Sequence, residues 1–275
     1  MAKARRMLTE SARMVDAVCE VIDARVPYSS RNPELASMIG EKPRMIIMNR
    51  TDLADPESTR AWSAYFRSKG AAVLETDCKS GKGTNAFQSA VRSLLREKLE
   101  SYAAKGQAGR ALRVMIVGIP NVGKSSFINR VAKRKAAEAS DRPGVTRGKQ
   151  WINLGSGIEL LDTPGLLWPK FEDKTIGENL AFTGAVKDQI IDTETLAAHL
   201  MERLRDRRPE SIETRYKFPP EDMDGFKLLE TAARKRGFLV SGGEPDIERM
   251  SAVLLDEFRG GKLGRITLEA PPEDL

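Results

Sequence analysis

Glycines, a lysine and two serines stand at fixed spacing near the middle of the chain, in the segment GIPNVGKSS (118–126). Gly118 and Gly123 leave room for backbone N–H groups to curl around a phosphate, and a helix that follows would present the positive end of its dipole. The Lys124 ammonium can reach terminal phosphates, and the Ser125 hydroxyl can bind Mg²⁺. The apolar run RVMIV before the loop predicts a strand and SSFINRVAK after it predicts a helix, which is the setting that phosphate binding needs.

An acidic turn, Asp162-Thr163-Pro164-Gly165, ends another predicted strand. A carboxylate at Asp162 can hold Mg²⁺ through a water, and the N–H of Gly165 can meet a γ-phosphate. The same four residues also make an ordinary turn, but their place after a phosphate loop and a predicted hairpin favours the functional reading. Thr146 lies between the loop and Asp162, where a switch threonine would close over Mg²⁺ and the γ-phosphate, although a plain loop threonine remains the alternative.

A purine-reading segment, Asn49-Arg50-Thr51-Asp52, follows the apolar run RMIIM. The Asp52 carboxylate can accept hydrogen bonds from guanine N1–H and the exocyclic amine, whereas adenine offers the opposite pattern at that edge. We expect Asn49 to steady the loop and contact the purine, and Arg50 to stack over it. An Asn-to-Asp turn without a ligand is the alternative.

A weaker signal comes from TDCKSGKG (76–83), directly after the next predicted strand. Cys78 and Lys79 then lie where a backbone N–H would reach guanine O6, and a bland loop is the alternative. With Asn121, Val122 and Ser126 of the phosphate loop, these residues complete the predicted guanine nucleotide site.

The guanine-reading segment precedes the phosphate loop along the chain, which reverses the order of an ordinary GTPase. Both segments follow predicted strands, and ligands of parallel α/β sheets bind at the carboxyl ends of the strands, so the chain order does not matter to the ligand. Chain termini often lie close together, so a fold can be cut and rejoined elsewhere. The linker KGQAGR (105–110) is the expected joint.

Strands that alternate with helices predict an α/β fold, with a mostly parallel sheet and helices on both faces. The hairpin INLGSGIEL (152–160) would add one antiparallel strand. After about residue 175 the strand signal fades, so we expect a domain at 1–178 followed by a small all-helical domain at 179–275. The predicted strands are 17–25, 44–49, 71–76, 113–118, 149–154 and 158–165, and the predicted helices are 56–69, 85–104, 124–137, 193–206, 221–236 and 246–258, the last three separated by RRPES and GFLVSGGEP.

The composition is that of a globular protein, with 275 residues, 40% apolar and 31% charged. The sequence lacks the run of about eighteen apolar residues that would span a membrane and a secretory signal, and its two cysteines, Cys19 and Cys78, have no metal-ligand spacing, so we expect a cytoplasmic protein. The net charge is +6, and its basic excess lies before about residue 180. Such a surface attracts polyanions, although solvated charges without a partner are the alternative.

Taken together, these motifs resemble the circularly permuted P-loop GTPases, and within them the ribosome biogenesis GTPase A family. The resemblance runs over nearly the whole chain and rests on MAKARR, DARVPYSSRNP, NRTDL, GIPNVGKSS, RPGVTRGKQW, LLDTPGLLWP and AFTGAVKD. It implies GTP hydrolysis with Mg²⁺, a helical C-terminal domain, and binding to the rRNA and proteins of the large ribosomal subunit during late assembly. We expect a monomer whose GTP form binds RNA, because GTP orders the switch segments 136–149 and 163–177. Hydrolysis would loosen these segments and release the RNA.

Two positions refine the expected catalytic group. Leu166 stands where other GTPases place a water-orienting Gln, so that group must come from elsewhere. Asn121 resembles the residue that holds K⁺ in potassium-activated relatives, or it merely shapes the loop. Relatives also carry an aromatic-Pro-Gly-His stretch before MAKAR whose histidine is a candidate for positioning water; this sequence shows only His199, which we expect to be a surface or packing residue.

Three functions stay open at this point: a large-subunit assembly GTPase, a small-subunit assembly GTPase of the permuted type, and a nucleotide-gated RNA-binding scaffold with negligible turnover. The second usually carries an oligonucleotide-binding barrel or zinc ligands, and neither pattern is present in this sequence. An ATPase is a further possibility that Asp52 argues against. The basic residues that we expect to face RNA are Lys3, Arg5, Arg6, Lys133, Arg134, Lys135, Arg142, Arg147 and Lys149, with a second patch at Arg234, Lys235 and Arg236.

Overall fold

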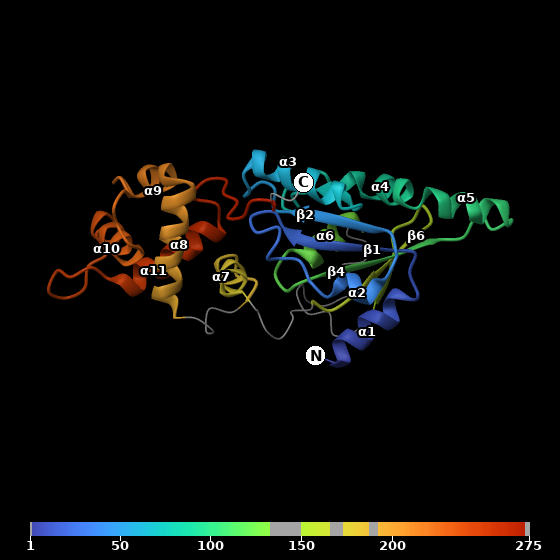
Figure 1. The fold of residues 1–275 in the computed structure, drawn as a ribbon, viewed down its shortest axis with the longest axis horizontal. Helices are drawn as coiled ribbons and strands as arrows, with labels where there is room; N and C mark the ends of the chain where they lie inside the picture. The colour runs from blue at the N-terminus through green and yellow to red at the C-terminus, as the bar shows by residue number, and fades with distance from the viewer. Residues whose placement is uncertain (1, 133–149, 166–172, 187–191, 273–275) are drawn as a thin grey trace.

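The computed structural model describes residues 2–132, 150–165, 173–186 and 192–272 (Figure 1). The predictions for Thr146 and Leu166, and for the basic residues from Lys133 to Lys149, therefore lie outside the described residues, as does the side chain of Lys3. No helix in the described ranges has the length and apolar character needed to cross a membrane.

A six-stranded sheet in the order β3-β2-β1-β4-β6-β5 forms the centre of the described chain. Five strands run parallel, and β5 pairs antiparallel with β6, which confirms the predicted hairpin. The strands are β1 (Ala17–Asp23), β2 (Arg44–Asn49), β3 (Ala72–Glu75), β4 (Leu112–Gly118), β5 (Gln150–Asn153) and β6 (Ile158–Asp162).

Strand β1 hydrogen-bonds on both sides, to β2 and to β4, although β2 and β4 lie far apart in the sequence. Its register aligns Asp23 with Asn49 on one side and Val21 with Gly118 on the other. Because these strands are parallel, all of them end at the same edge of the sheet. The segments that follow β2 and β4, predicted to read guanine and to hold phosphate, are therefore neighbours in space.

Helices cover both faces of the sheet, as predicted. The helices α4 (Phe87–Leu94), α5 (Arg96–Ala104) and α6 (Lys124–Val131) pack on one face, while α1 (Ala2–Ala12), α2 (Leu35–Ile39) and α3 (Pro56–Ser68) pack on the other. Side chains alternate along β1 between these layers: Val21 lies in the core with Phe127, Val18 lies with Leu8 and Leu35, and Ile22 lies with Trp62.

Several element boundaries differ from the prediction. The helix expected over 85–104 is divided into a 3-10 turn (Thr84–Ala86), α4 and α5, with a break at Leu95. The segment RRPES, expected to separate two helices, instead begins α9 (Pro209–Tyr216), because Pro209 occupies a first-turn position where its missing N–H costs nothing. The sequence patterns did not predict α1 or α2.

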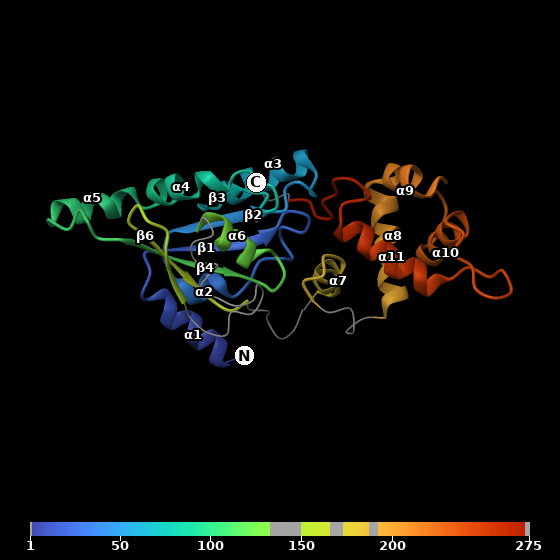
Figure 2. The ribbon, with the colours of Figure 1, turned by 180° about the vertical axis from the view of Figure 1, so that it is seen from behind.

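The C-terminal helices α7 (Lys174–Phe182), α8 (Thr193–Arg207), α10 (Gly225–Lys235) and α11 (Ile247–Arg259) gather with α9 at one end of the sheet. Figure 2 shows α7 between this group and the strand ends. Aspartates begin α8, α10 and α11, where their carboxylates accept backbone N–H groups of the first turn. The three predicted C-terminal helices are thus present.

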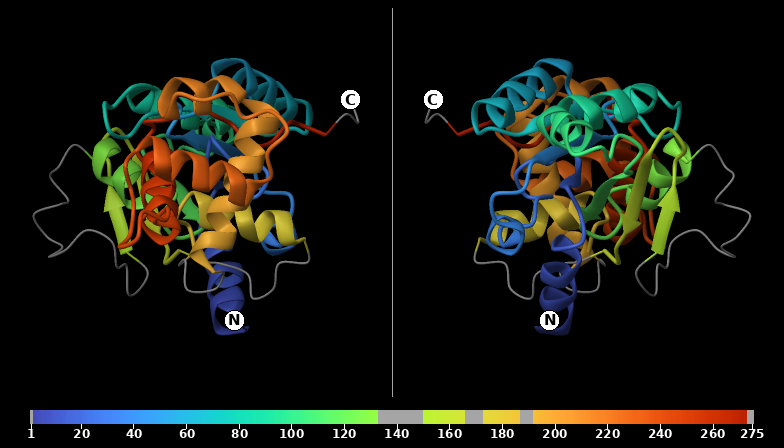
Figure 3. Two further views of the ribbon diagram at one scale, coloured as in Figure 1. Left: turned by 90° about the vertical axis from the view of Figure 1, so that its left-hand side faces the viewer. Right: turned by 90° about the vertical axis from the view of Figure 1, so that its right-hand side faces the viewer.

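The chain after α11 returns to the sheet rather than staying with the helical group (Figure 1), and Figure 3 shows its last described part beside α3. The N–H of Ile266 donates to Leu53 O at 2.9 Å, and the N–H of Leu268 donates to Arg25 O at 2.8 Å. On α3, Trp62 Nε1 donates to Glu269 O at 3.1 Å. The boundary proposed after residue 178 falls inside α7, so the division into 1–178 and 179–275 stays a prediction.

The packing behind α6 generates a stability prediction. Phe127 is fully buried and meets the ring of Phe87 edge-on, with 5.1 Å between ring centroids. We expect Phe127→Ala to lower the free energy of unfolding by about 3–5 kcal/mol, because the truncation leaves a cavity. Phe226→Ala, at a side chain that is 51% exposed, is the control and should stay within about 0.5 kcal/mol of the parent. Urea unfolding of both variants measures the difference, and equal losses would contradict the assigned core.

Candidate active site

A cavity with a volume of about 1060 Å³ opens where the parallel strands end. Its lining joins segments that are distant in the sequence, and it includes Asp52 and Lys124. Asp162 and Val122 are buried beside it, at 6% and 1% exposure. The predicted site residues in the lining are Asn49, Arg50, Asp52, Cys78, Lys79, Asn121, Gly123, Lys124, Ser125, Ser126 and Gly165.

The phosphate loop connects β4 to α6, and Gly123 caps the helix with φ 91°. A Cβ atom on Gly123 would lie 2.2 Å from Asn49 Nδ2, and one on Gly118 would lie 2.8 Å from Val21 O. Close approach therefore requires glycine at both positions, and the left-handed backbone is a second requirement at Gly123 alone. The N–H groups at the start of α6 point toward an anion placed in the cavity.

Lys124 and Asp162 form a buried ion pair between Nζ and Oδ1. The pairing of β4 with β6 aligns Ile116 with Asp162, and Thr163 Oγ1 donates to Ile116 O at 2.9 Å, which fixes the start of the acidic turn. The residue predicted to meet phosphate thus lies against the residue predicted to serve Mg²⁺. A hydroxyl from Ser125 and one carboxylate suit Mg²⁺, which takes few protein ligands and completes its shell with phosphate oxygens and water.

Asn49 links the guanine-reading segment to two other loops. Its Nδ2 donates to Val122 O at 2.9 Å, and its Oδ1 accepts the N–H of Cys78 at 3.2 Å. The side chain is buried, so both ends of the amide need these partners. The contacts agree with the expectation that Asn49 steadies its loop.

Arg50 has a left-handed backbone, with φ 62°, and its guanidinium is held at two points. Nη1 lies 3.3 Å from Asp23 Oδ2, and Nη2 donates to Asn121 O at 2.8 Å. The guanidinium is thus held beside the phosphate loop. The sequence predicted that Arg50 stacks over the purine, and it did not predict this contact.

Asp23 is a buried acid that the sequence patterns missed. Arg25, also buried, donates to it from Nε at 3.0 Å and from Nη2 at 2.8 Å. Burial alone would raise the pKa of Asp23, but the charges and hydrogen bonds of Arg25, aided by Arg50, hold that pKa below its ordinary value. Asp23 therefore stays ionised and keeps both arginines in place.

The second base loop is shaped by side chains that accept its N–H groups. Asp77 accepts the N–H of Lys79 at 2.7 Å and of Ser80 at 3.2 Å, and Arg130 of α6 donates to the carbonyls of Cys78 and Lys79. Because the N–H groups of Cys78 and Lys79 have acceptors in the protein, one of them must exchange its acceptor to meet guanine O6. Burial raises the pKa of the Cys78 thiol to about 11, so Cys78 serves the loop as a neutral residue.

The sequence carried a signal for Asp77 but none for Arg130. An Asp two residues before a free backbone N–H in a turn-forming run is typical of an Asx turn, which TDCKS fits. Arg130 lies on a helix among other exposed polar residues, and only the packing of α6 beside the loop gives it a role.

The C-terminal helices also contribute to the cavity, through Thr183, Gly184, Arg259 and Gly260. The nearest tie to the phosphate loop is the hydrogen bond from Asn121 Nδ2 to Gly184 O, at 2.8 Å. None of these four residues was predicted as a site residue, although Thr183 and Gly184 stand in the quoted segment AFTGAVKD.

Comparison with known proteins agrees with this geometry. A family model described as "50S ribosome-binding GTPase" matches residues 113–223. Ribosome biogenesis GTPase A of Bacillus cereus is 44% identical over 273 residues, covering 99% of this chain and 92% of the relative. The chain belongs to the ribosome biogenesis GTPase A family. It is a GTPase with a circularly permuted domain, and it binds guanine nucleotides.

A further relative and a solved structure also match over nearly their whole length. Ribosome biogenesis GTPase A of Priestia megaterium is 44% identical over 274 residues, covering 99% of this chain and 95% of the relative. The GDP-bound structure of a YlqF protein superimposes with a TM-score of 0.72 at 28% identity, covering 96% of this chain and 98% of that one. The roles of individual residues in this family member remain predictions from the geometry described above.

Gly123 offers a sharp test of the phosphate loop. We expect Gly123→Ala to weaken GDP binding about tenfold or more, because the new methyl group displaces Asn49 and a left-handed backbone costs about 1–3 kcal/mol for a residue other than glycine. Gly109→Ala is the matched control, since Gly109 has no positive φ and open space around its Cβ position. Titration with a fluorescent GDP analogue measures both, and equal affinities in the two variants would contradict the assignment.

Proposed function

We propose that this GTPase assists assembly of the large ribosomal subunit in the cytoplasm, with the GTP form bound to ribosomal RNA and hydrolysis releasing it. The observation that carries the proposal is one cavity whose lining joins Asn49 and Asp52, predicted to read guanine, with Lys124 and Ser125 of the phosphate loop, in a chain of this family. The matching family model is described as 50S ribosome-binding, which supports the large subunit as the partner. The monomeric state expected from the sequence stays a prediction.

The phosphate end of the proposed site lies at the start of α6. Backbone N–H groups from Gly123 to Ser126 hold the phosphates, and Lys124 moves from Asp162 to the terminal phosphates when a nucleotide enters. Ser125, Asp162 and Thr146 are the residues that would hold Mg²⁺, which when bound neutralises charge on the phosphate oxygens. Gly165, at the cavity wall, offers its N–H to the γ-phosphate.

The base end of the proposed site lies across the cavity. Asp52 is an exposed carboxylate in the lining and takes guanine N1–H and the exocyclic amine. Asn49 contacts the purine while it keeps the loop tied to Val122. Guanine O6 is left to the loop at Cys78 and Lys79, after one of their N–H groups changes its acceptor.

A monovalent cation is the proposed source of extra positive charge during hydrolysis. Asn121 donates from Nδ2 to Gly184 O, which leaves Oδ1 as the atom that can accept a cation such as K⁺. A cation beside the phosphates would stabilise negative charge that develops in the transition state, as an arginine finger does in other GTPases.

The RNA-binding surface rests on weaker support. Arg234 pairs with Glu230 and Glu244, and Arg236 lies 3.6 Å from Glu257, so part of the patch at 234–236 is already neutralised within the protein. Arg6 likewise pairs with Glu10. RNA contact is therefore proposed for the exposed Lys235 first, and for the remaining basic residues as predicted.

Hydrolysis with and without ribosomal subunits tests the proposal. We expect GTP turnover to rise at least about tenfold with large subunits and to remain at the basal rate with small subunits. We also expect KCl to support faster hydrolysis than NaCl at equal ionic strength. Co-sedimentation should show tighter binding to large subunits with a non-hydrolysable GTP analogue than with GDP. No stimulation by any subunit would favour the scaffold alternative, and stimulation by small subunits alone would reassign the partner.

Base specificity gives a second test. We expect Asp52→Asn to lose GTP hydrolysis and to gain activity on xanthosine triphosphate, because the amide donates to the oxygen that replaces the guanine amine. Asp222→Asn is the control, an exposed aspartate whose left-handed backbone, φ 58°, suits asparagine equally. Steady-state kinetics on both nucleotides measure the preference, and an unchanged profile in Asp52→Asn would argue against the assigned base contact.

A further inference from the structure

Arg259, the last residue of α11, lines the same cavity as the phosphate loop. Its guanidinium donates from Nη2 to Ala181 O at 2.8 Å and from Nε to Phe182 O at 3.2 Å. Both carbonyls belong to the last turn of α7, where helices leave acceptors without internal partners. One arginine from α11 therefore fixes the end of another helix at the edge of the cavity.

The turn that Arg259 fixes presents a carbonyl to the phosphate loop. Gly184 follows with φ 73° and donates its N–H to Ala181 O at 3.0 Å, so the same carbonyl accepts from Gly184 and Arg259. The oxygen of Gly184 then accepts Asn121 Nδ2 at 2.8 Å. Arg259 thus acts on Asn121 through two steps, the α7 carbonyls and the Gly184 carbonyl.

Asn121 needs such support because its backbone is unusual. Its φ of 62° lies in the left-handed region, which asparagine tolerates better than most residues but which is still less favourable than the right-handed region. Two hydrogen bonds hold Asn121 there, one from its Nδ2 to Gly184 O and one from Arg50 Nη2 to its backbone carbonyl. Loss of either would let the centre of the phosphate loop relax.

The second support leads back to the same helix. Arg50 pairs with Asp23, and Asp23 pairs with Arg25. Arg25 Nη1 lies 3.4 Å from Phe258 O and 3.5 Å from Arg259 O, and its guanidinium lies over the Phe258 ring. The hydrogen bonds therefore close a ring that begins and ends at α11 and passes through Asn121.

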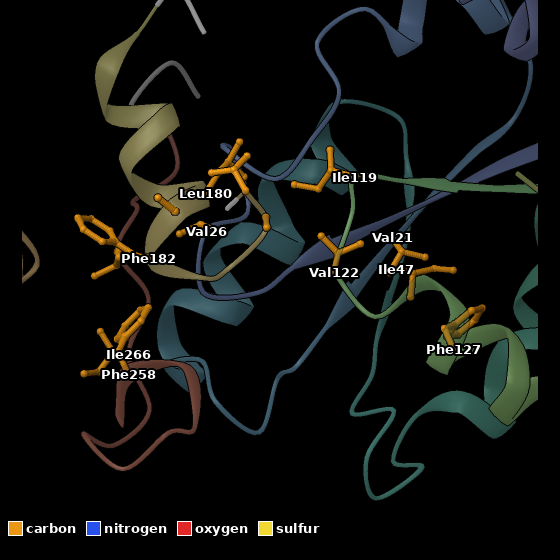
Figure 4. Packing of buried hydrophobic residues seen from close by; sticks show 14 of the residues in the cluster. Val21, Val26, Ile47, Ile119, Val122, Phe127, Leu180, Phe182, Phe258 and Ile266 are labelled. Atoms are coloured by element: carbon orange, nitrogen blue, oxygen red, sulfur yellow. The ribbon is translucent and has the colours of Figure 1, made fainter. Parts of the chain in front are cut away.

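Apolar packing holds the elements that form this ring of hydrogen bonds in place. Figure 4 shows Phe182, Phe258 and Ile266 together, with Leu180 and Val26 between them and the phosphate-loop residue Ile119, and all six side chains belong to one apolar cluster. All of these side chains are almost fully buried. A shift of α11 would therefore move both supports of Asn121 together.

We propose that Arg259 is a positioning residue for GTP hydrolysis, which acts through the Gly184 carbonyl to hold Asn121 of the phosphate loop. The proposal rests on the nucleotide site proposed above, and it adds a residue of the C-terminal helices to the machinery of that site. It follows that the position of α7 and α11 relative to the sheet determines the conformation of the phosphate loop. A partner that moves α11 would change the hydrolysis rate without touching the nucleotide.

A double-mutant cycle tests the proposal on the full chain, with single-turnover GTP hydrolysis and GDP affinity as readouts. We expect Arg259→Ala to slow hydrolysis about tenfold while GDP affinity stays within about threefold, since Asp52 and Lys124 keep their places. Asn121→Ala should slow hydrolysis by a similar factor, and Arg259→Ala should add no further loss in that background. Arg259→Lys, which keeps the charge but lacks the planar fork that reaches both carbonyls, should recover part of the rate.

Control variants separate the outcomes. Arg249→Ala removes an exposed arginine from the same helix, where it stacks on Phe238 and does not line the cavity, and it should hydrolyse GTP at the parental rate. Additive losses in the double variant, or parental rates in Arg259→Ala, would overturn the proposal. If Arg259→Ala does not fold, as thermal unfolding would show, the cycle is run with Arg259→Lys. Parental hydrolysis in Lys124→Ala and Asn121→Ala would instead overturn the proposed nucleotide site.

Discussion

The parallel pairing of β1 with both β2 and β4 is the constraint on which the site depends. β1 donates to and accepts from a strand on each side, and this places the ends of β2 and β4 next to its own end. Parallel strands must all finish at one edge, so the loops after them converge whatever their order in the chain. A base-reading segment and a phosphate loop that are about seventy residues apart can then share one cavity, as Asn49 and Val122 show by direct hydrogen bond.

Buried charge is arranged to hold these loops rather than to stabilise a core. Asp23, which is 2% exposed, forms ion pairs with two arginines, Arg25 and Arg50, that belong to different loops. Removing a carboxylate of this kind would strand buried positive charge, which costs about 3–5 kcal/mol in buried pairs. An apolar residue could fill the space, but it could not tie the guanidiniums of Arg25 and Arg50 to one point between the base segment and α11.

The C-terminal helices contribute to the wall of the cavity that is proposed to bind the nucleotide. Gly184 and Arg259 line the cavity, and the tail after α11 adds hydrogen bonds to Leu53 and to the chain after β1. Nucleotide and partner can influence one another only if both bias the same structural element. Under the proposal for Arg259, the contact between α7, α11 and the phosphate loop is such an element.

The sequence by itself determined where the six strands lie and which segments carry the candidate chemistry, although β1 and β6 end two and three residues earlier than predicted. The spacing from Gly118 to Ser125, the acid at Asp162 and the run from Asn49 to Asp52 depend on local backbone geometry, so their residue types could be interpreted one segment at a time. All six strands were located for the same reason, since apolar runs of that length bounded by turn residues have few alternatives. The short α2 carried too little periodic pattern to be predicted, and Pro209 was taken for a separator although it begins a helix.

Only the tertiary structure decided which side chains hold the loops together. No sequence pattern assigned a positioning role to Asp23, Arg130 or Arg259, and each contacts a guanidinium or a backbone carbonyl from another segment of the chain. The same holds for the loop at Cys78 and Lys79, where one backbone N–H is predicted to reach guanine O6: the sequence did not show that these two N–H groups donate to Asn49 and Asp77 within the protein. Local sequence encodes the residues that touch a ligand, because the ligand demands their chemistry. The residues that position them are chosen by proximity in three dimensions, which spacing along the chain does not express.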